Sequence, residues 1–92
     1  MLEDKLLILR IKRGDCDALR RIYDKYKGDL LKLAIFLTGD IYCSEDVVQD
    51  VFVKLAQSFD RVGIRSNLRN YLITCIINRI RTLRRDHQRH EE

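Results

Sequence analysis

Proline is absent from this 92-residue chain, and glycine occurs only four times. These two residues interrupt helices most readily, so their scarcity beside abundant Leu, Ile, Lys, Arg and Asp favours long helices. Three glycines and two polar clusters divide the sequence into four segments. The helices predicted for these segments span about residues 4–12, 16–38, 45–57 and 67–85. We therefore predict an all-α fold, a compact bundle of three to four helices in a single domain over residues 1–92.

Apolar residues recur in each predicted helix at three- and four-residue spacing, which is the helical period. In the first helix they are Leu6, Leu7 and Ile11, and in the second Leu19, Ile22, Tyr23, Tyr26, Leu30, Leu33, Ala34 and Leu37. In the third they are Val47, Val48, Val51, Phe52, Leu55 and Ala56. In the last they are Leu68, Leu72, Cys75, Ile76, Ile80 and Leu83, joined by the aliphatic stem of Arg79. We expect these faces to form the core.

Residues at the ends of the predicted helices fit the positions of helix caps. Asp15, Ser44 and Asn67 precede the second, third and last helices, and side chains of these types accept hydrogen bonds from the first amides of a helix. Gly39 follows the second helix, where a residue in the left-handed conformation commonly ends a helix. We therefore expect four well-defined helix ends at these residues.

Charge is divided unevenly along the chain, although the net charge is only +4. Residues 1–60 contain ten Lys/Arg and eleven Asp/Glu, whereas residues 61–90 contain eight Arg, no Lys and one acid, Asp86. Arginine binds phosphate in a bidentate manner and stacks on bases better than lysine does. The C-terminal third is therefore typical of a surface that binds a polyanion. The alternative from charge alone is a solvated helix end, because cations are favoured at a helix C-terminus.

Two of the predicted helices carry a polar strip opposite the apolar face. On the third helix the strip consists of Asp46, Gln49, Asp50, Val53 and Lys54. On the last helix it consists of Asn70, Thr74, Asn78, Arg81 and Arg85. Amides and hydroxyls one turn apart, followed by arginines, are the side chains that read base edges and bind phosphates. The spacing alone is equally compatible with an ordinary exposed helix face.

The sequence does not indicate a metal, disulfide or catalytic site. Cys16, Cys43 and Cys75 are odd in number and widely spaced, so we expect free thiols in a reducing cytoplasm. His87 and His90 have a spacing that could hold a metal, but no third ligand is near them in the sequence. No Gly-rich phosphate loop or nucleophile–base pair occurs, and no apolar run approaches the roughly 20 residues that cross a bilayer. We therefore expect a cytoplasmic protein with no enzymatic activity, no cofactor and no membrane segment.

The order of these segments resembles a known family. Gly39 and Asp40, followed by the run SEDVVQDVF at residues 44–52, resemble the most characteristic segment of bacterial sigma factors, closest to the extracytoplasmic-function (ECF) group of the sigma-70 family. Upstream, Gly14-Asp15 with Ala18 and residues 23–26 resemble the start of that group's second-domain helix. Downstream, residues 67–85, with Tyr71-Leu72 and Asn78, resemble its promoter-reading helix. The resemblance covers essentially the whole chain.

This resemblance implies an all-helical sigma domain 2 with two macromolecular partners. In the family, the acidic and amide face of the third helix docks on the clamp helices of the RNA polymerase β′ subunit. The implied polymerase-binding residues are Asp46, Gln49, Asp50, Val53 and Lys54. The last helix and the loop before it recognise and melt the −10 promoter element, partly as unpaired bases of the non-template strand. The implied DNA-binding residues are Arg61, Arg65, Ser66, Asn67, Arg69, Asn70, Tyr71, Thr74, Asn78, Arg81, Arg84 and Arg85.

Several features depart from the family pattern. Family members often carry tryptophan where Tyr71 stands, and arginine where Thr74 and Ile77 stand. The chain therefore keeps an aromatic surface but leaves the phosphate contacts to Arg69, Arg81, Arg84 and Arg85. The loop at 61–66 is the least family-like stretch, so the sequence does not give the preferred base. Sigma factors of this group also have a second DNA-binding domain, for the −35 element, which is absent from these 92 residues.

Other classes of function are compatible with a bundle of this kind. A helical protein–protein interaction or regulatory adaptor module would need no DNA specificity, and an anti-sigma factor is a further partner that the resemblance allows. An adaptor has no need of a segment with eight arginines and one acid, so the charge favours the sigma domain. A helix-turn-helix repressor that reads duplex DNA is disfavoured, because the short helix pair with a tight glycine turn is missing.

Overall fold

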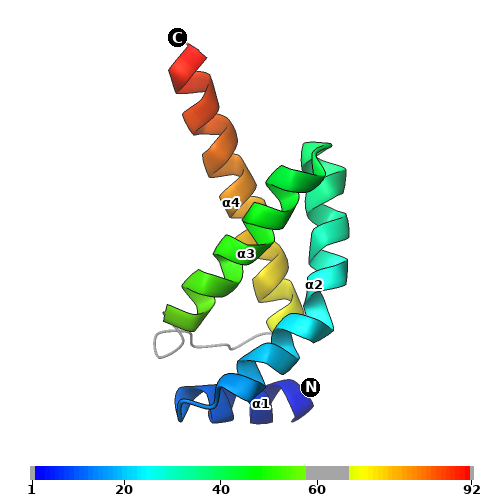
Figure 1. Cartoon of the computed structure of the whole chain (residues 1–92), viewed down its shortest axis with the longest axis vertical. Helices are drawn as coiled ribbons and strands as arrows, with labels where there is room; N and C mark the ends of the chain where they lie inside the picture. The colour runs from blue at the N-terminus through cyan, green and yellow to red at the C-terminus, as the bar shows by residue number, and fades with distance from the viewer. Residues whose placement is uncertain (1, 58–66, 92) are drawn as a thin grey trace.

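The computed structural model describes residues 2–57 and 67–91, and these residues form four α-helices without a strand. Their bounds are Leu2–Lys12 (α1), Cys16–Thr38 (α2), Ile41–Gln57 (α3) and Leu68–Glu91 (α4). Helix α2 contacts each of the other three, and α3 also packs on α4. The predicted all-α fold is confirmed. The last turns of α4 extend beyond the ends of the other helices (Figure 1), and the molecule measures 45 × 23 × 22 Å.

An apolar core lies between the four helices. Helix α4 contributes Leu68, Leu72, Ile76 and Ile80, one turn apart, as the spacing predicts. The core residues of α2 and α3 are Ala18, Ile22, Tyr26, Leu30, Ala34, Val47, Val48, Val51, Phe52 and Leu55. Ala56, which the spacing also places in the apolar face of α3, is exposed, because it stands at the edge of that face. The periodicity therefore gives the centre of each buried face but not its edge.

A buried polar cluster determines which face of α1 packs on α2. Asp4 is only 4% exposed, and its carboxylate accepts hydrogen bonds from the Tyr26 hydroxyl (2.5 Å) and the Lys25 ammonium (2.9 Å). This contact turns Leu7 and Ile8 into the core. The prediction that Leu6 is buried is wrong, since its side chain is 53% exposed. The spacing of apolar residues alone could not reveal which face of α1 points inward, because Asp4, one of the inward residues, is charged.

Asp4→Asn is expected to destabilise the fold at pH 7 by about 1.5–3 kcal/mol, the usual contribution of a hydrogen bond to a charged group. Burial alone raises the pKa of the Asp4 carboxyl, but the hydrogen bonds from Tyr26 and Lys25 outweigh burial and hold the pKa below its usual value of 3.8. A carboxyl with a lowered folded-state pKa stabilises the fold above its unfolded-state pKa, and this stabilisation is lost as pH falls through the folded-state pKa.

Urea unfolding at pH 7 and at pH 3 tests this expectation. The difference in unfolding free energy between the native chain and Asp4→Asn should shrink at the lower pH. Asp29→Asn, which removes an exposed carboxylate from α2, serves as the control and should change little at either pH. A difference for Asp4→Asn that is equally large at both pH values would show that the charge is not what stabilises the contact.

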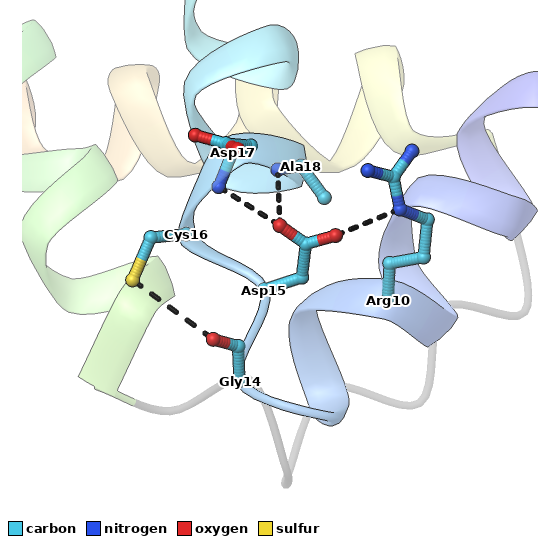
Figure 2. Close-up of polar contacts among 6 residues, drawn as sticks. All are labelled: Arg10, Gly14, Asp15, Cys16, Asp17 and Ala18. Carbon is cyan, nitrogen blue, oxygen red and sulfur yellow. Dashed lines mark hydrogen bonds and ion pairs between the residues drawn. The ribbon is translucent and has the colours of Figure 1, made fainter.

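The cap of α2 forms as predicted, and Figure 2 shows its hydrogen bonds. The Asp15 carboxylate accepts hydrogen bonds from the backbone amides of Asp17 (3.0 Å) and Ala18 (3.3 Å), and from Arg10 Nε of α1 (2.8 Å). At the other end, Gly39 has φ +71° and its amide donates to the Ile35 carbonyl. That left-handed conformation costs a side-chain-bearing residue free energy, which explains glycine at this turn.

Helix α3 begins earlier than predicted, at Ile41, because Asp40 and not Ser44 is its cap. The Asp40 carboxylate accepts hydrogen bonds from the amides of Tyr42 (2.9 Å) and Cys43 (3.2 Å). Ser44 is fully buried inside the helix, where its hydroxyl lies 2.7 Å from the Asp40 carbonyl and 2.8 Å from the Thr38 hydroxyl. It therefore joins the ends of α2 and α3. Asn67 does cap α4, accepting from the Arg69 amide at 2.8 Å.

Candidate functional site

The polar strip predicted on the third helix lies on the outer face of α3, and we call it the α3 strip (Asp46, Gln49, Asp50, Val53 and Lys54). Asp46, Gln49 and Lys54 are exposed, and half of the Val53 surface is exposed. Asp50 differs from them, because its Oδ2 atom accepts hydrogen bonds from Arg79 Nε (3.2 Å) and Nη2 (3.0 Å) of α4. The strip therefore presents one carboxylate, one amide, one ammonium and an apolar side chain, while its second carboxylate is bonded to α4.

Two shallow hollows lie beside the α3 strip, between α2 and α3. One, of about 340 Å³, has an almost wholly apolar lining that includes Leu19, Phe52 and Val53. The other, of about 370 Å³, lies farther along and includes Lys27 and Glu45. Tyr23 and Gln49 line both hollows, so the two adjoin. Sequence reasoning missed the part that α2 plays here, because the helical period assigns Leu19 and Tyr23 simply to the core.

The polar strip predicted on the last helix is solvent-accessible along α4, and we call it the α4 strip (Asn70, Thr74, Asn78, Arg81 and Arg85). All five residues are exposed, and so is Arg69. The Thr74 hydroxyl donates to the Asn70 carbonyl at 2.9 Å, so its proton is used within the helix. The amide side chains of Asn70 and Asn78 are therefore the neutral donors of the strip that a bound molecule would meet. Arg61, Arg65 and Ser66 lie outside the described residues.

A third hollow, of about 250 Å³, lies between α3 and α4, and we call it the α3–α4 hollow. Its lining includes Lys54 from the α3 strip, Asn78 from the α4 strip, and the half-buried Tyr71 and Arg79. Burial raises the pKa of the Tyr71 hydroxyl above its usual value, so the phenol keeps its proton at neutral pH. The hollow thus combines an aromatic ring, an amide and two cations, and the sequence did not predict that these residues meet.

Arg84 has a different environment from Arg69, Arg81 and Arg85, the other predicted DNA-binding arginines that the structure describes. Its guanidinium donates a hydrogen bond to the backbone carbonyl of Leu37, in the last turn of α2. The last four carbonyls of a helix have no intrahelical partner, and a cation is favoured at that end. Arg84 therefore ties the extended part of α4 to the end of α2. Arg81 and Arg85 lie on the exposed surface of α4.

Comparison with known proteins identifies the family to which this four-helix chain belongs. Residues 22–90 match the sigma-70 region 2 family, and the chain belongs to this family. It is also similar to the ECF RNA polymerase sigma factor SigW of Bacillus subtilis (strain 168), with 29% identity over 74 residues. That alignment covers 80% of the chain and 40% of the relative, so the chain spans less than half the length of SigW. The two likenesses confirm the predicted family, a region 2 domain of the ECF type.

Membrane and metal sites can be assessed for the part of the chain that the structure describes. No helix there is both long enough and apolar enough to cross a membrane. Among the same residues, no three His, Cys, Asp or Glu side chains are grouped where they could hold a metal ion. Cys16, Cys43 and Cys75 are free thiols.

Proposed function

We propose that this chain is the part of a bacterial sigma factor that docks on the β′ clamp helices of RNA polymerase and recognises and melts the −10 promoter element. The observation that carries the proposal is the α3–α4 hollow, in which Tyr71 and Asn78 line one concavity beside two cationic side chains. An unpaired base needs a ring to stack on and polar groups at its edge. This lining supplies both, in a family of promoter-recognition factors.

The α4 strip supplies the rest of the DNA surface in this proposal. Arg81 and Arg85 are four residues apart on the exposed side of α4, so they are neighbours one helical turn apart on the same face. In this proposal both contact phosphates of the bound strand. Arginine contacts to phosphate release counterions and give affinity that does not depend on sequence. The amides of Asn70 and Asn78 are the groups that can distinguish one base edge from another.

The α3 strip, with the two hollows beside it, is the proposed docking surface for the polymerase. Asp46 and Gln49 offer a carboxylate and an amide to basic and polar side chains of a partner. Val53 stands at the edge of the apolar hollow and can bury its exposed half against the same partner. A surface with an apolar centre and a polar rim is the usual anatomy of a protein–protein interface.

A regulatory adaptor without DNA specificity is the second candidate, and the α2–α3 hollows by themselves would suit it. An adaptor function does not explain the arginines of α4 or the α3–α4 hollow. The two candidates differ in one measurable property, which is a preference among DNA single strands.

Substitutions on α4 separate base recognition from charge. Asn78→Ala is expected to reduce discrimination among single strands by about 1–3 kcal/mol, because a lost base contact costs that much, and to leave the salt dependence unchanged. Arg85→Ala should weaken binding to every strand and reduce the salt slope by about 0.7, the value for one phosphate contact on a single strand. The assay uses the chain bound to core RNA polymerase, with a panel of −10-region non-template strands at two salt concentrations.

Arg21→Ala, which removes an exposed arginine from α2, is the matched control and should leave binding and the salt slope unchanged. Equal and uniform losses for Asn78→Ala and Arg85→Ala would show that α4 is only an electrostatic surface. The absence of any preference among strands in the native complex would instead favour the adaptor.

A further inference from the structure

Gly28 lies in the middle of α2, at a position where glycine is unfavourable. Helix α2 runs from Cys16 to Thr38, so Gly28 is well away from both ends. Glycine destabilises a helix interior relative to alanine, because its backbone loses more conformational freedom on folding. A glycine at this position therefore calls for a reason, either in the fold or in a contact that the folded chain makes.

The fold of the unbound chain does not require glycine at position 28. Gly14 and Gly39 have positive φ angles, which favour glycine, whereas Gly28 does not. Apart from its chain neighbours and the backbone of the adjoining turns, a Cβ atom added at Gly28 would meet no atom of the described residues within 4 Å. Alanine would therefore fit here without strain and would make the helix more stable.

Gly28 lines the hollow of about 370 Å³ between α2 and α3, which we call the Gly28 hollow. Side chains of both helices surround it, among them Tyr23, Lys27 and Leu31 of α2 and Glu45 and Gln49 of α3. Gly28 is exposed, so the backbone of α2 is accessible from the hollow. Because Gln49 also belongs to the α3 strip, the hollow continues the proposed docking surface from α3 onto α2.

The charges beside the Gly28 hollow favour a basic group of a partner. Lys27 already has partners within α2, since its Nζ atom lies 5.3 Å from the centre of the Tyr23 ring and 3.6 Å from Asp24 Oδ1. The Glu45 carboxylate is exposed and makes no hydrogen bond or ion pair with the described residues. A cation that enters the hollow can therefore pair with Glu45, and the neighbouring Asp46 adds a second negative charge.

We infer that Gly28 is the point at which a helix of the docked partner comes closest to α2, with a basic side chain of that helix in the Gly28 hollow beside Glu45. The distance between two packed helices depends on the side chains at their contact, and glycine allows the shortest distance. Glycine at this position then favours docking and disfavours the helix. The inference rests on the proposed docking on the β′ clamp helices and extends the docking surface to α2.

A larger residue at position 28 is expected to have opposite effects on stability and on binding. Gly28→Ala should raise the thermal midpoint of the full 92-residue chain by about 4–8 °C, because alanine is the best helix former. Gly28→Gln should also raise the midpoint, by a smaller amount, because glutamine forms helices nearly as well as alanine. Thermal unfolding followed by circular dichroism measures both shifts.

Titration of the same variants with a fragment containing the β′ clamp helices measures docking. Gly28→Ala is expected to weaken the affinity about tenfold, because an added methyl group overpacks a close contact. Gly28→Gln should weaken it about a hundredfold, because its longer side chain occupies the hollow itself. The loss of affinity should therefore increase with the size of the side chain, although both variants are more stable than the native chain.

Asp29→Gln is the matched control, because it places the same side chain at the next position of α2, which is exposed and lines neither hollow between α2 and α3. It should change the affinity for the fragment less than about threefold. Glu45→Gln tests the basic group of the partner. It should weaken binding about fivefold and reduce its dependence on salt, as the loss of an exposed ion pair does.

Native affinity in Gly28→Gln would overturn the inference, because a partner helix in close contact with α2 could not accept the longer side chain. Equal losses for Gly28→Ala and Gly28→Gln would also overturn it, since docking would then depend on the flexibility of glycine. A thermal midpoint lowered in both variants would mean that the fold itself requires glycine. An equal loss for Asp29→Gln would show that the effect is not specific to the hollow, and unchanged binding by Glu45→Gln would exclude the basic group.

The failure of the proposed function would be recognised separately. If the native chain does not bind the fragment, the proposed docking is itself wrong, and the contact at Gly28 falls with it. If the double variant Asp46→Ala/Gln49→Ala loses affinity while both variants of Gly28 keep it, the α3 strip is the docking surface and only the approach to α2 is overturned.

Discussion

Phe52→Ala is expected to lower the free energy of unfolding by about 3–5 kcal/mol, as the removal of a buried ring does. Only 6% of Phe52 is exposed, and its ring meets the Tyr23 ring edge to face, with the ring centres 4.9 Å apart. Substitution by alanine would remove both the apolar surface that Phe52 buries on folding and its contact with the Tyr23 ring. A small domain has about 5–15 kcal/mol of stability in total, so this one substitution removes a large part of it.

Thermal unfolding followed by circular dichroism measures the effect, because each kcal/mol shifts the midpoint by roughly 4–8 °C in a domain of this size. The chain provides a matched control in Phe36, the same residue type on α2, which is 84% exposed. Phe36→Ala should change the unfolding free energy by no more than about 0.5 kcal/mol. Similar midpoints for the two variants would mean that Phe52 does not belong to the core and that the assigned face of α3 is wrong.

The sequence was sufficient to predict most of the core, because the spacing of large apolar residues follows the helical period. The buried turns of α4, from Leu68 to Ile80, lie where this period places them. The prediction failed for α1, where the charged residue Asp4 takes a buried position in the first turns of the inward face. A charged residue is expected at the surface unless its partners are known, and those partners are on another helix.

The start of α3 was mispredicted because two residues near it both have the chemistry of a cap. The sequence pattern favours Ser44, yet the Asp40 carboxylate binds the first amides and the helix includes four additional residues. The Ser44 hydroxyl instead bonds groups at the end of α2 and at the turn. Only the tertiary arrangement distinguishes a serine that caps a helix from one that is buried in its first turns.

The exposed strips of α3 and α4 could be predicted as surfaces, whereas the contacts between them could not. A helical period assigns each residue to a face of its own helix and says nothing of how two helices meet. Arg79 was assigned to the inner face by its stem, and its bond to Asp50 depends on the packing of α3 against α4. The same packing creates the α3–α4 hollow and brings Lys54 close to Asn78 and Tyr71.

The largest functional effect is expected from substitutions in the α3 strip that avoid the Asp50–Arg79 pair. The double variant Asp46→Ala/Gln49→Ala should weaken binding to the β′ clamp helices by about 2–5 kcal/mol. This loss arises because a basic group of the partner, buried on docking, would be left without its carboxylate and amide. Both positions are exposed in the unbound chain, so the helix content and the thermal midpoint should remain close to native.

The control is the double variant Asp29→Ala/Gln88→Ala, which removes the same two chemical groups from exposed positions on α2 and α4. It tests whether the loss of affinity is specific to the α3 strip. Titration of the native chain and both double variants with the clamp-helix fragment gives the three affinities. Because 1.4 kcal/mol corresponds to a tenfold change in affinity, the expected loss is at least about 25-fold for the α3 variant and less than threefold for the control. If both double variants lose affinity equally, the binding depends on overall charge and the α3 strip is not the docking surface. If neither loses affinity, the partner must bind through the apolar hollow beside Leu19 and Val53 without help from the polar residues.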